Sequence, residues 1–285
     1  MQPMLTVLAP GPLATVQDQG RPGHAVLGVS HSGAADRAAL RLANRLVGNA
    51  DTAAGVEATL GGLQVRAERD LLVALTGAAG PADIDGHPVP SGEPVRLGVG
   101  AMLRLGAPVT GLRTYLAVSG GIAVQPVLGS RATDTLSGLG PAPLTPGTRL
   151  PVGSETVSEP QRWGAVSPLP HGELRLRVVL GPRHDWFPTG AIEHLLTLPG
   201  TVQSQADRVG VRLSGRTLER NRRDELPSEG CLRGALQVIT DGALILLGPD
   251  CPVTGGYPVI AVVIDADNDR GGQARPGDRI RFERA

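Results

Sequence analysis

The polar residues best suited to chemistry gather in the last third of the chain, at the ends of short apolar runs. Two arginines there supply fixed positive charge, and two carboxylates can act as acids, bases or orienting groups once partly buried. A Thr-Gly-Gly-Tyr turn lets a ligand approach main-chain N–H groups closely. For any one of these residues, a turn-stabilising salt bridge is an equally good explanation. The set comprises Arg208, Arg212, Glu229, Gln237, Asp250, Thr254, Gly255, Gly256 and Tyr257.

A second polar group lies near the N-terminus, where two glycines bracket Arg21. A guanidinium in such a turn can form two parallel hydrogen bonds to a carboxylate, carbamate or phosphate. The residues alone favour a simpler interpretation, in which Arg21 staples its own loop by pairing with Asp18 or Asp36. Asn44 and Glu57 complete the group.

Several chemistries are excluded by what the chain lacks. All 27 basic residues are arginine, so lysine Schiff bases, a P-loop lysine and a biotinyl-lysine are absent from this polypeptide. The six histidines lack metal-ligand spacing and there is no Cys-x-x-Cys motif, so we expect no bound metal. Cys231 directly follows Ser-Glu-Gly, but a half-buried structural thiol is favoured over a nucleophile. Without a G-x-x-x-x-G-K-[ST] loop, arginines and loop amides must hold the phosphates of any bound nucleotide.

The amino-acid composition limits the classes of molecule that the protein is expected to bind. The 27 acidic residues balance the 27 basic ones, which removes the electrostatic argument for nucleic acid or an anionic membrane. The apolar stretches fall far short of the roughly 20 residues that span a bilayer. The first residues lack signal-peptide features, and two cysteines make no disulfide framework. We therefore expect a cytoplasmic protein with a small substrate or a soluble partner.

Short apolar runs between turn signals predict a mainly β protein. An amphipathic helix is predicted over Ala34–Val47 with a stop at Gly48, and a shorter helix over Thr189–Leu196 with Thr189 as a possible cap. The predicted strands are Leu5–Leu8, Leu71–Leu75, Val95–Leu97, Met102–Leu105, Leu116–Val118, Leu174–Leu180, Leu236–Ile239, Leu244–Leu247, Val259–Ile264 and Arg279–Phe282.

The two ends of the chain resemble each other. Gly61–Val65 followed by Leu71–Gly77 aligns with Gly234–Val238 followed by Leu244–Gly248. A repeat in preserved order predicts two related β barrels, although chance similarity in a Gly/Val-rich chain remains an alternative. The expected organisation is a first barrel over residues 1–110, a middle extension and linker over 111–172, and a second barrel over 173–285.

Longer motifs carry a family resemblance. They include Thr15–Asn49, Tyr115–Ile122, ADRVGVRL at Ala206–Leu213, TGGYP at Thr254–Pro258 and RPGDRIRF at Arg275–Phe282. Together they resemble the biotin-dependent carboxyltransferase family, also called allophanate hydrolase subunit 2, KipA or the C subunit of 5-oxoprolinase. The resemblance covers essentially the whole chain and implies two cyclophilin-like β-barrel domains with a few short helices.

The family resemblance implies three possible activities. One branch of the family is a 5-oxoprolinase component that uses ATP with companion subunits to open 5-oxo-L-proline to L-glutamate. Another branch is the carboxyltransferase of urea carboxylase, which here needs carboxybiotin on a separate carrier, and a third is a KipA-like regulator that binds a kinase inhibitor. Because the 285 residues hold a single family unit, we expect the first. Expected partners are a companion B-type subunit of the allophanate hydrolase subunit 1 family, a LamB-type hydrolase subunit, and a small amide or carboxylate substrate.

We expect the site to lie mainly in the second barrel, and the chemistry of its residues suggests their roles. An amide needs one acceptor and one donor aimed at its polar edges, and a Glu–Gln pair on neighbouring strands supplies both. We expect Glu229, Gln237 and Asp250 to be catalytic. The substrate-binding set is Arg208 and Arg212 for the anionic part, Thr254, Gly255, Gly256 and Tyr257 around the pocket, and Arg21, Asn44 and Glu57 as a related site or brace in the first barrel.

Overall fold

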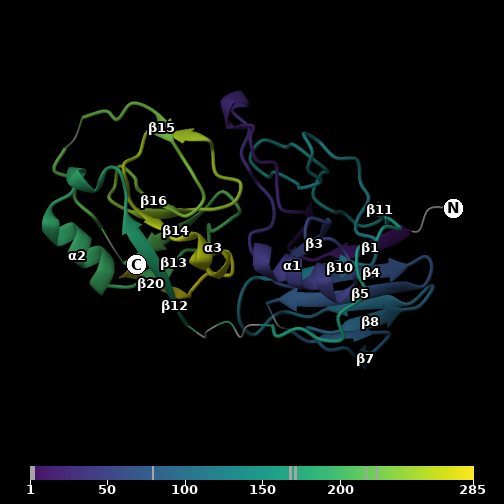
Figure 1. Cartoon of the computed structure of the whole chain (residues 1–285). Coiled ribbons are helices and arrows are strands. Elements are labelled where there is room, and N and C mark those ends of the chain that lie inside the picture. The colour runs from purple at the N-terminus through teal and green to yellow at the C-terminus, as the bar shows by residue number, and fades with distance from the viewer. Residues whose placement is uncertain (1–3, 79, 167–168, 170–171, 216, 223) are drawn as a thin grey trace. The chain divides into compact units, whose positions relative to one another are not determined.

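A computed structural model describes the chain except residues 1–3, 79, 167–168, 170–171, 216 and 223 (Figure 1). The chain divides into two compact units, which are described separately. The first comprises Met1–Arg21, Ser32–Asp134 and Gly138–Leu169. The second comprises Pro22–His31, Thr135–Ser137 and Pro170–Ala285.

The first unit is built from two antiparallel sheets. The six-stranded sheet has the order β11 (Arg149–Pro151), β1 (Met4–Pro10), β4 (Leu63–Ala67), β9 (Met102–Leu105), β6 (Ala82–Ile84) and β7 (His87–Pro88). The five-stranded sheet has the order β2 (Leu13–Gln17), β3 (Gly55–Thr59), β10 (Arg113–Val118), β5 (Leu71–Gly77) and β8 (Pro94–Leu97). The segment predicted as an extension and linker therefore supplies β10 and β11 to these sheets.

Strand β10 shows how the first unit distributes its apolar residues. All of its residues are buried, and successive side chains of a strand point to opposite faces. Leu116 and Val118 join the core cluster that also contains residues of the six-stranded sheet. Tyr115 and Ala117 join the cluster formed with the helix α1 (Arg37–Leu46), which lies beside β10 and β5 in Figure 1. The five-stranded sheet is thus covered on both faces.

Helix α1 begins later than the predicted residue Ala34. The Asp36 carboxylate accepts the N–H of Ala39 at 2.9 Å and so caps the helix. The helix stops at Leu46, before Gly48, whose φ of 78° is left-handed. The predicted stop at Gly48 is confirmed, whereas the predicted start ignored the carboxylate that ends the preceding loop.

The second unit contains a closed barrel. Its strand order is β12 (Glu173–Leu180), β19 (Val259–Val263), β16 (Ala235–Val238), β17 (Leu244–Leu247), β14 (Gly210–Ser214), β13 (Gly200–Val202) and β20 (Arg279–Arg284). The ring closes through the parallel pairing of β20 with β12. A separate two-stranded ladder joins β15 (Glu229–Gly230) to β18 (Thr254–Gly255). Two 3-10 turns, η1 (Ala25–Leu27) and η2 (His184–Trp186), also belong to this unit.

Two helices accompany the barrel. Helix α2 (Thr189–Thr197) packs against β20 and begins one residue after Pro188, whose extended backbone occupies the cap position without a side-chain hydrogen bond. The prediction of Thr189 as the cap is therefore wrong. Helix α3 (Asp265–Gly271) packs against β12 and was not predicted, because it carries no apolar stripe. Nowhere in the described residues is there a helix long and apolar enough to cross a membrane.

The prediction of a mainly β fold is confirmed, and every predicted apolar run overlaps a strand. The two halves of the repeat nevertheless pair differently. In the second unit β16 and β17 are hydrogen-bonded neighbours. In the first unit the corresponding β4 and β5 belong to different sheets, and the described strands form two sheets where a second closed ring was expected.

Asp267 of α3 provides a test of what holds this helix to the barrel. Its carboxylate accepts the main-chain N–H of Arg177 at 2.8 Å and two guanidinium N–H groups of the same residue at 2.9 and 3.0 Å. These bonds hold the pKa of Asp267 below its ordinary value. We expect Asp267→Asn to lower the free energy of unfolding by roughly 1–3 kcal/mol at neutral pH, as measured by urea unfolding.

The pH dependence has a definite sign. The contribution of the carboxylate is complete above its unfolded pKa of about 3.9 and disappears as pH falls through the lower folded pKa. The stability gap between wild type and Asp267→Asn should therefore close in acid. Glu283→Gln, which removes the exposed partner of Arg175, should cost less than about 0.5 kcal/mol. A gap that persists unchanged below the folded pKa would contradict the assignment.

Candidate functional site

The β15–β18 ladder gathers several of the predicted site residues in the second unit. Glu229 pairs directly with Gly255 across the ladder. A Cβ at Gly255 would lie 2.9 Å from the Cys231 Sγ and 3.1 Å from the Gln237 Nε2. A side chain at Gly255 would therefore require Cys231 and Gln237 to shift.

Glu229 has a partner that the sequence did not indicate. Its carboxylate accepts hydrogen bonds from the Arg183 Nε at 2.9 and 3.1 Å, and from the Nη2 of the same guanidinium. These bonds hold the pKa of Glu229 below its ordinary value, so the side chain is a carboxylate at neutral pH. It can accept a hydrogen bond or a proton but cannot start as a general acid. The available sequence signal was position, since Arg183 lies three residues after Leu180, where β12 ends.

Gln237 braces the same cluster from β16. Its Nε2 lies 3.3 Å from the Cys231 Sγ and 3.5 Å from the main-chain oxygen of Tyr257. Burial raises the pKa of Cys231, and that of Cys251 to about 12, so both remain thiols at neutral pH. This favours the structural interpretation of Cys231, because the thiolate is the reactive form. Tyr257 is 43% exposed at the edge of the cluster.

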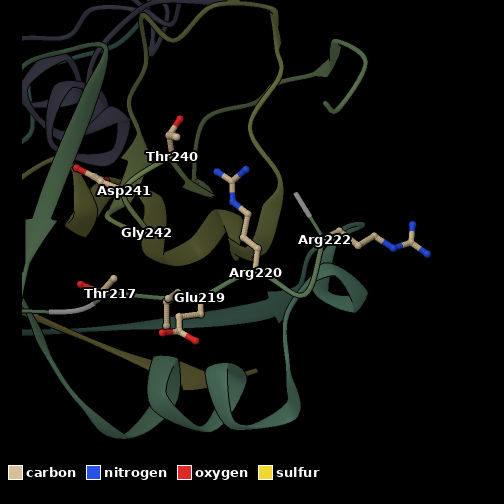
Figure 2. Close-up of a pocket in the computed structure, with 8 residues that line it drawn as sticks. Thr217, Glu219, Arg220, Arg222, Thr240, Asp241 and Gly242 are labelled. Atoms are coloured by element: carbon tan, nitrogen blue, oxygen red, sulfur yellow. The ribbon is translucent and has the colours of Figure 1, made fainter. Parts of the chain in front are cut away.

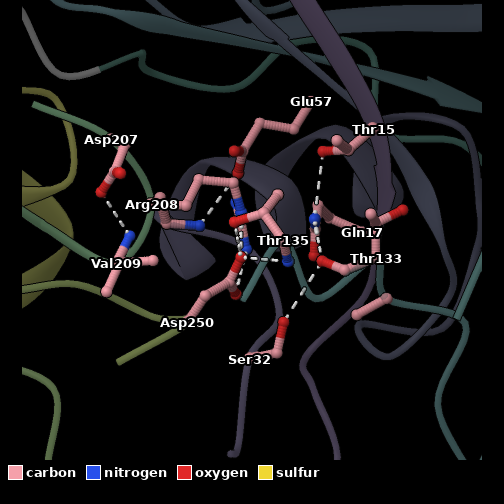
Figure 3. Close-up of polar contacts among 12 residues, drawn as sticks. Thr15, Gln17, Ser32, Glu57, Thr133, Thr135, Asp207, Arg208, Val209 and Asp250 are labelled. Atoms are coloured by element: carbon pink, nitrogen blue, oxygen red, sulfur yellow. Dashed lines mark hydrogen bonds and ion pairs between the residues drawn. The ribbon is translucent and has the colours of Figure 1, made fainter. Parts of the chain in front are cut away.

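Arg208 and Asp250 form a buried ion pair in the same unit, drawn in Figure 3. The Arg208 Nε and Nη2 donate to the two carboxylate oxygens at 2.8 and 3.0 Å, and the side chains are 1% and 0% exposed. Thr135 adds its main-chain N–H and its hydroxyl to the same carboxylate, at 2.9 and 2.8 Å. The guanidinium predicted to bind a substrate anion thus has a carboxylate partner within the protein.

Arg212 has a different neighbourhood from Arg208. It forms an ion pair with Asp241 at 2.5 Å, and Asp241 lines a cavity of about 500 Å³ (Figure 2). The other lining residues come from the segment before β15 and from the β16–β17 turn. They are Thr217, Leu218, Glu219, Arg220, Arg222, Thr240 and Gly242.

In the first unit, Glu57 on β3 lies in a buried network. Its carboxylate accepts the Tyr115 hydroxyl at 2.8 Å and the Ala35 N–H at 2.9 Å, and it lies 3.3 Å from the Arg113 Nε. The Tyr115 oxygen in turn accepts the N–H of Asp36 at 2.7 Å. Burial and the neighbouring Glu57 carboxylate raise the pKa of Tyr115 well above its ordinary value. These contacts join β3, β10 and the start of α1.

Asn44 and Arg21 differ in how many of their side-chain polar atoms form hydrogen bonds. Asn44 donates to the main-chain oxygen of Ala53 at 2.8 Å and accepts from Asn49 at 3.1 Å, so it bridges a loop. Arg21 is 1% exposed and donates from Nη2 to the main-chain oxygen of Ala132. Its Nε and Nη1 have no hydrogen-bond partner among the described residues.

Asp18 takes over the stapling role that the sequence suggested for Arg21. Its carboxylate accepts the N–H of Gly20 at 2.8 Å, the Ser130 hydroxyl at 2.6 Å and the N–H of Arg131 at 2.6 Å. Carboxylates that accept several main-chain N–H groups hold turns in place effectively. The loop that carries Arg21 is therefore fixed by Asp18.

The Arg208–Asp250 pair generates a prediction about stability. Breaking a buried ion pair by removing one partner costs about 3–5 kcal/mol, because the other charge stays buried and loses that counter-charge. We expect Arg208→Met and Asp250→Leu each to lower the free energy of unfolding by this amount in urea titrations.

The double variant distinguishes the pair from two independent contacts. Arg208→Met/Asp250→Leu should lose much less than the sum of the single variants, since it removes both members of the pair together. Strict additivity would show that the two side chains act separately. Loss of activity in either single variant must be compared with these stabilities before it is assigned to catalysis.

Comparison with known proteins places this geometry in a family. The family model described as carboxyltransferase domain, subdomain A and B, matches residues 27–284. The chain is 41% identical over 282 residues to the C subunit of 5-oxoprolinase from Escherichia coli strain K12, with 98% of this chain and 90% of that protein covered.

Two solved structures share the fold over nearly the full chain. The structure of TTHA0988 has a TM-score of 0.90 at 37% identity, with 99% of this chain and 56% of that chain covered. The Kluyveromyces lactis urea carboxylase has a TM-score of 0.92 at 29% identity, with 100% of this chain and 28% of that chain covered. This chain thus spans about half and about a quarter of the two solved chains.

Within the described residues, no group of three or more His, Cys, Asp or Glu side chains is placed to hold a metal ion. The family predicted from the sequence motifs is confirmed by the match over residues 27–284 and by the 41% identical relative. The chain belongs to the carboxyltransferase domain family that contains subdomains A and B.

Proposed function

We propose that the protein is the C-type subunit of an ATP-dependent 5-oxoprolinase, which opens 5-oxo-L-proline to L-glutamate together with companion subunits. The observation that carries this proposal is the 41% identity to the C subunit of the Escherichia coli 5-oxoprolinase over 98% of this chain and 90% of the relative. The sequence similarity therefore extends over nearly all of both proteins.

The β15–β18 cluster supports a lactam-binding role. A lactam presents an N–H donor and a carbonyl acceptor on neighbouring atoms, and Glu229 is an ionised acceptor for the N–H. Glycines at Gly255 and Gly256 allow the main chain to approach the carbonyl, whose developing charge a main-chain N–H can stabilise. Gln237 orients the cluster by its contacts with Cys231 and Tyr257.

The ATP-dependent part of the reaction is assigned to the assembled complex. This chain has neither lysine nor a P-loop, and its phosphate-handling groups are limited to arginines and loop amides. When bound, ATP supplies the driving force for opening an unstrained lactam. The companions proposed for this step are a B-type subunit of the allophanate hydrolase subunit 1 family and a LamB-type hydrolase.

A second candidate is the carboxyltransferase step of a urea carboxylase. It is favoured by the TM-score of 0.92 to the Kluyveromyces lactis urea carboxylase over the whole of this chain. Because the 285 residues contain no lysine, the biotin would have to arrive on another protein. Transfer of labelled carboxylate from a carboxybiotin carrier to urea is the observation that separates this candidate from the first.

Reconstitution tests the proposed function. We expect the purified chain, mixed with its companion subunits, ATP and 5-oxo-L-proline, to release glutamate and ADP together. The companion subunits without this chain serve as the control. Turnover no greater than in that control would contradict the proposal, and carboxyl transfer to urea in its place would select the second candidate.

Glu229 and Arg183 provide the residue-level prediction. Glu229→Gln should reduce kcat/KM by at least tenfold, or about 1.4 kcal/mol of transition-state stabilisation, because an amide is a poor proton acceptor. Arg183→Gln should move the acidic limb of the pH–rate profile to higher pH, since Glu229 then regains its ordinary pKa.

Two controls accompany these variants. Arg175→Gln removes an exposed arginine from β12 and should leave the profile unchanged. Unfolding titrations establish that each variant folds. An unshifted acidic limb in Arg183→Gln would show that the ion pair has no part in the reaction.

A further inference from the structure

The cavity of about 500 Å³ in the second unit lies outside the set of residues predicted from the sequence. Its volume falls within the range of roughly 300–1,000 Å³ typical of small-molecule pockets. Figure 2 shows the Arg220 side chain extending toward Thr240, whereas the Arg222 side chain points away. Arg222 instead lies over the Trp186 ring, with its guanidinium carbon 5.8 Å from the ring centre.

Arg220 is the unusual residue of this cavity. It donates from Nη2 to the main-chain oxygen of Val238, and no carboxylate in the described part of the chain forms an ion pair with it. Burial lowers the pKa of Arg220, and the compensating influence comes from Tyr257 rather than from an acid. A partly desolvated guanidinium without a counter-charge is prepared to receive an anion.

The charges around the cavity specify which kind of anion fits. The Glu219 and Arg222 side chains point away from the Arg220 guanidinium (Figure 2), and Asp241 is already neutralised by Arg212. The excess is therefore one positive charge. A polyphosphate carries several negative charges and would be repelled by Glu219 and Asp241 at the rim of the cavity. A monoanion carries one negative charge, which the one excess positive charge balances.

The location connects this cavity to the lactam cluster. Val238, which accepts from Arg220, directly follows Gln237 on β16, and the Val238 N–H donates to the Pro258 oxygen at 3.1 Å. Gln237 contacts Tyr257 one residue earlier. Arg220 thus approaches the same strand and the same loop that carry the cluster.

We propose that this cavity is a monocarboxylate-binding subsite in which Arg220 receives the carboxylate of the substrate and the Thr240 hydroxyl borders it. The choice of 5-oxo-L-proline as the substrate rests on the proposed function. The site itself rests on the cavity and its uncompensated guanidinium. Arg220 then distinguishes an acidic lactam from a neutral one.

Binding to the full-length chain, without ATP or companion subunits, tests this subsite. Isothermal titration should show that Arg220→Gln weakens 5-oxo-L-proline binding at least tenfold and leaves binding of uncharged 2-pyrrolidinone unchanged. Arg220→Lys, which keeps the charge but loses the fork, should fall between wild type and Arg220→Gln. Arg222→Gln removes an equal charge two positions away and should bind both compounds as wild type does.

Four results would overturn the subsite. They are an absence of 5-oxo-L-proline binding to wild type, equal affinity in Arg220→Gln, an equal loss in Arg222→Gln, and a parallel loss of 2-pyrrolidinone binding. Failure of the reconstituted reaction with carboxylate binding intact would remove the proposed function and leave the subsite. Normal turnover of the reconstituted complex, with no effect of Arg220→Gln on either 5-oxo-L-proline binding or KM, would remove the subsite and leave the proposed function.

Discussion

The buried pair of Arg208 and Asp250 is the constraint on which the second unit's candidate site depends. Beyond the side-chain bonds, the Asp250 N–H donates to the Arg208 oxygen at 3.0 Å, and the Gly248 N–H donates to the Val209 oxygen at 2.8 Å. A Cβ at Gly248 would lie 2.3 Å from the Arg208 oxygen, so only glycine permits this approach. The chain that leaves β17 is thereby fixed before it reaches β18 and its ladder with Glu229. The pair thus positions the main chain that leads from β17 to the β15–β18 ladder.

Sequence reasoning located the polar residues at strand ends but not their partners. Period and turn signals predicted β16, β17 and β19, because a buried strand needs a short apolar run and little else. Ion pairs depend on which loops meet in three dimensions. Arg183 and Glu229 are separated by 46 residues, and nothing local to either residue specifies the other. Helix α3 was missed for a related reason, since it has no apolar stripe and its Asp267 bonds to a strand that is distant in the sequence.

The repeat illustrates a further limit of sequence patterns. Strands β4 and β16 have similar sequences, and each is followed in the chain by an apolar strand. Only β16 pairs with the strand that follows it. In the first unit β4 pairs with β1 and β9, while β5 pairs with β10 and β8. Apolar alternation specifies which face of a strand is buried but not which neighbour supplies its hydrogen bonds. The same strand pattern is therefore compatible with a closed ring and with two sheets.

All 27 basic residues of the chain are arginine. The carboxylates that form ion pairs with these arginines therefore have permanently charged partners, and this affects the proposed chemistry. Arginine does not lose its proton in proteins, so the Arg183 guanidinium stabilises the Glu229 carboxylate throughout the working pH range. Opening a lactam releases an amine, which must gain a proton as the C–N bond breaks. Glu229 can supply that proton only after first taking one, for example from the attacking water. In the proposed reaction it therefore acts as a base before it acts as an acid, and the strength of its bond to Arg183 sets how readily it exchanges the two roles.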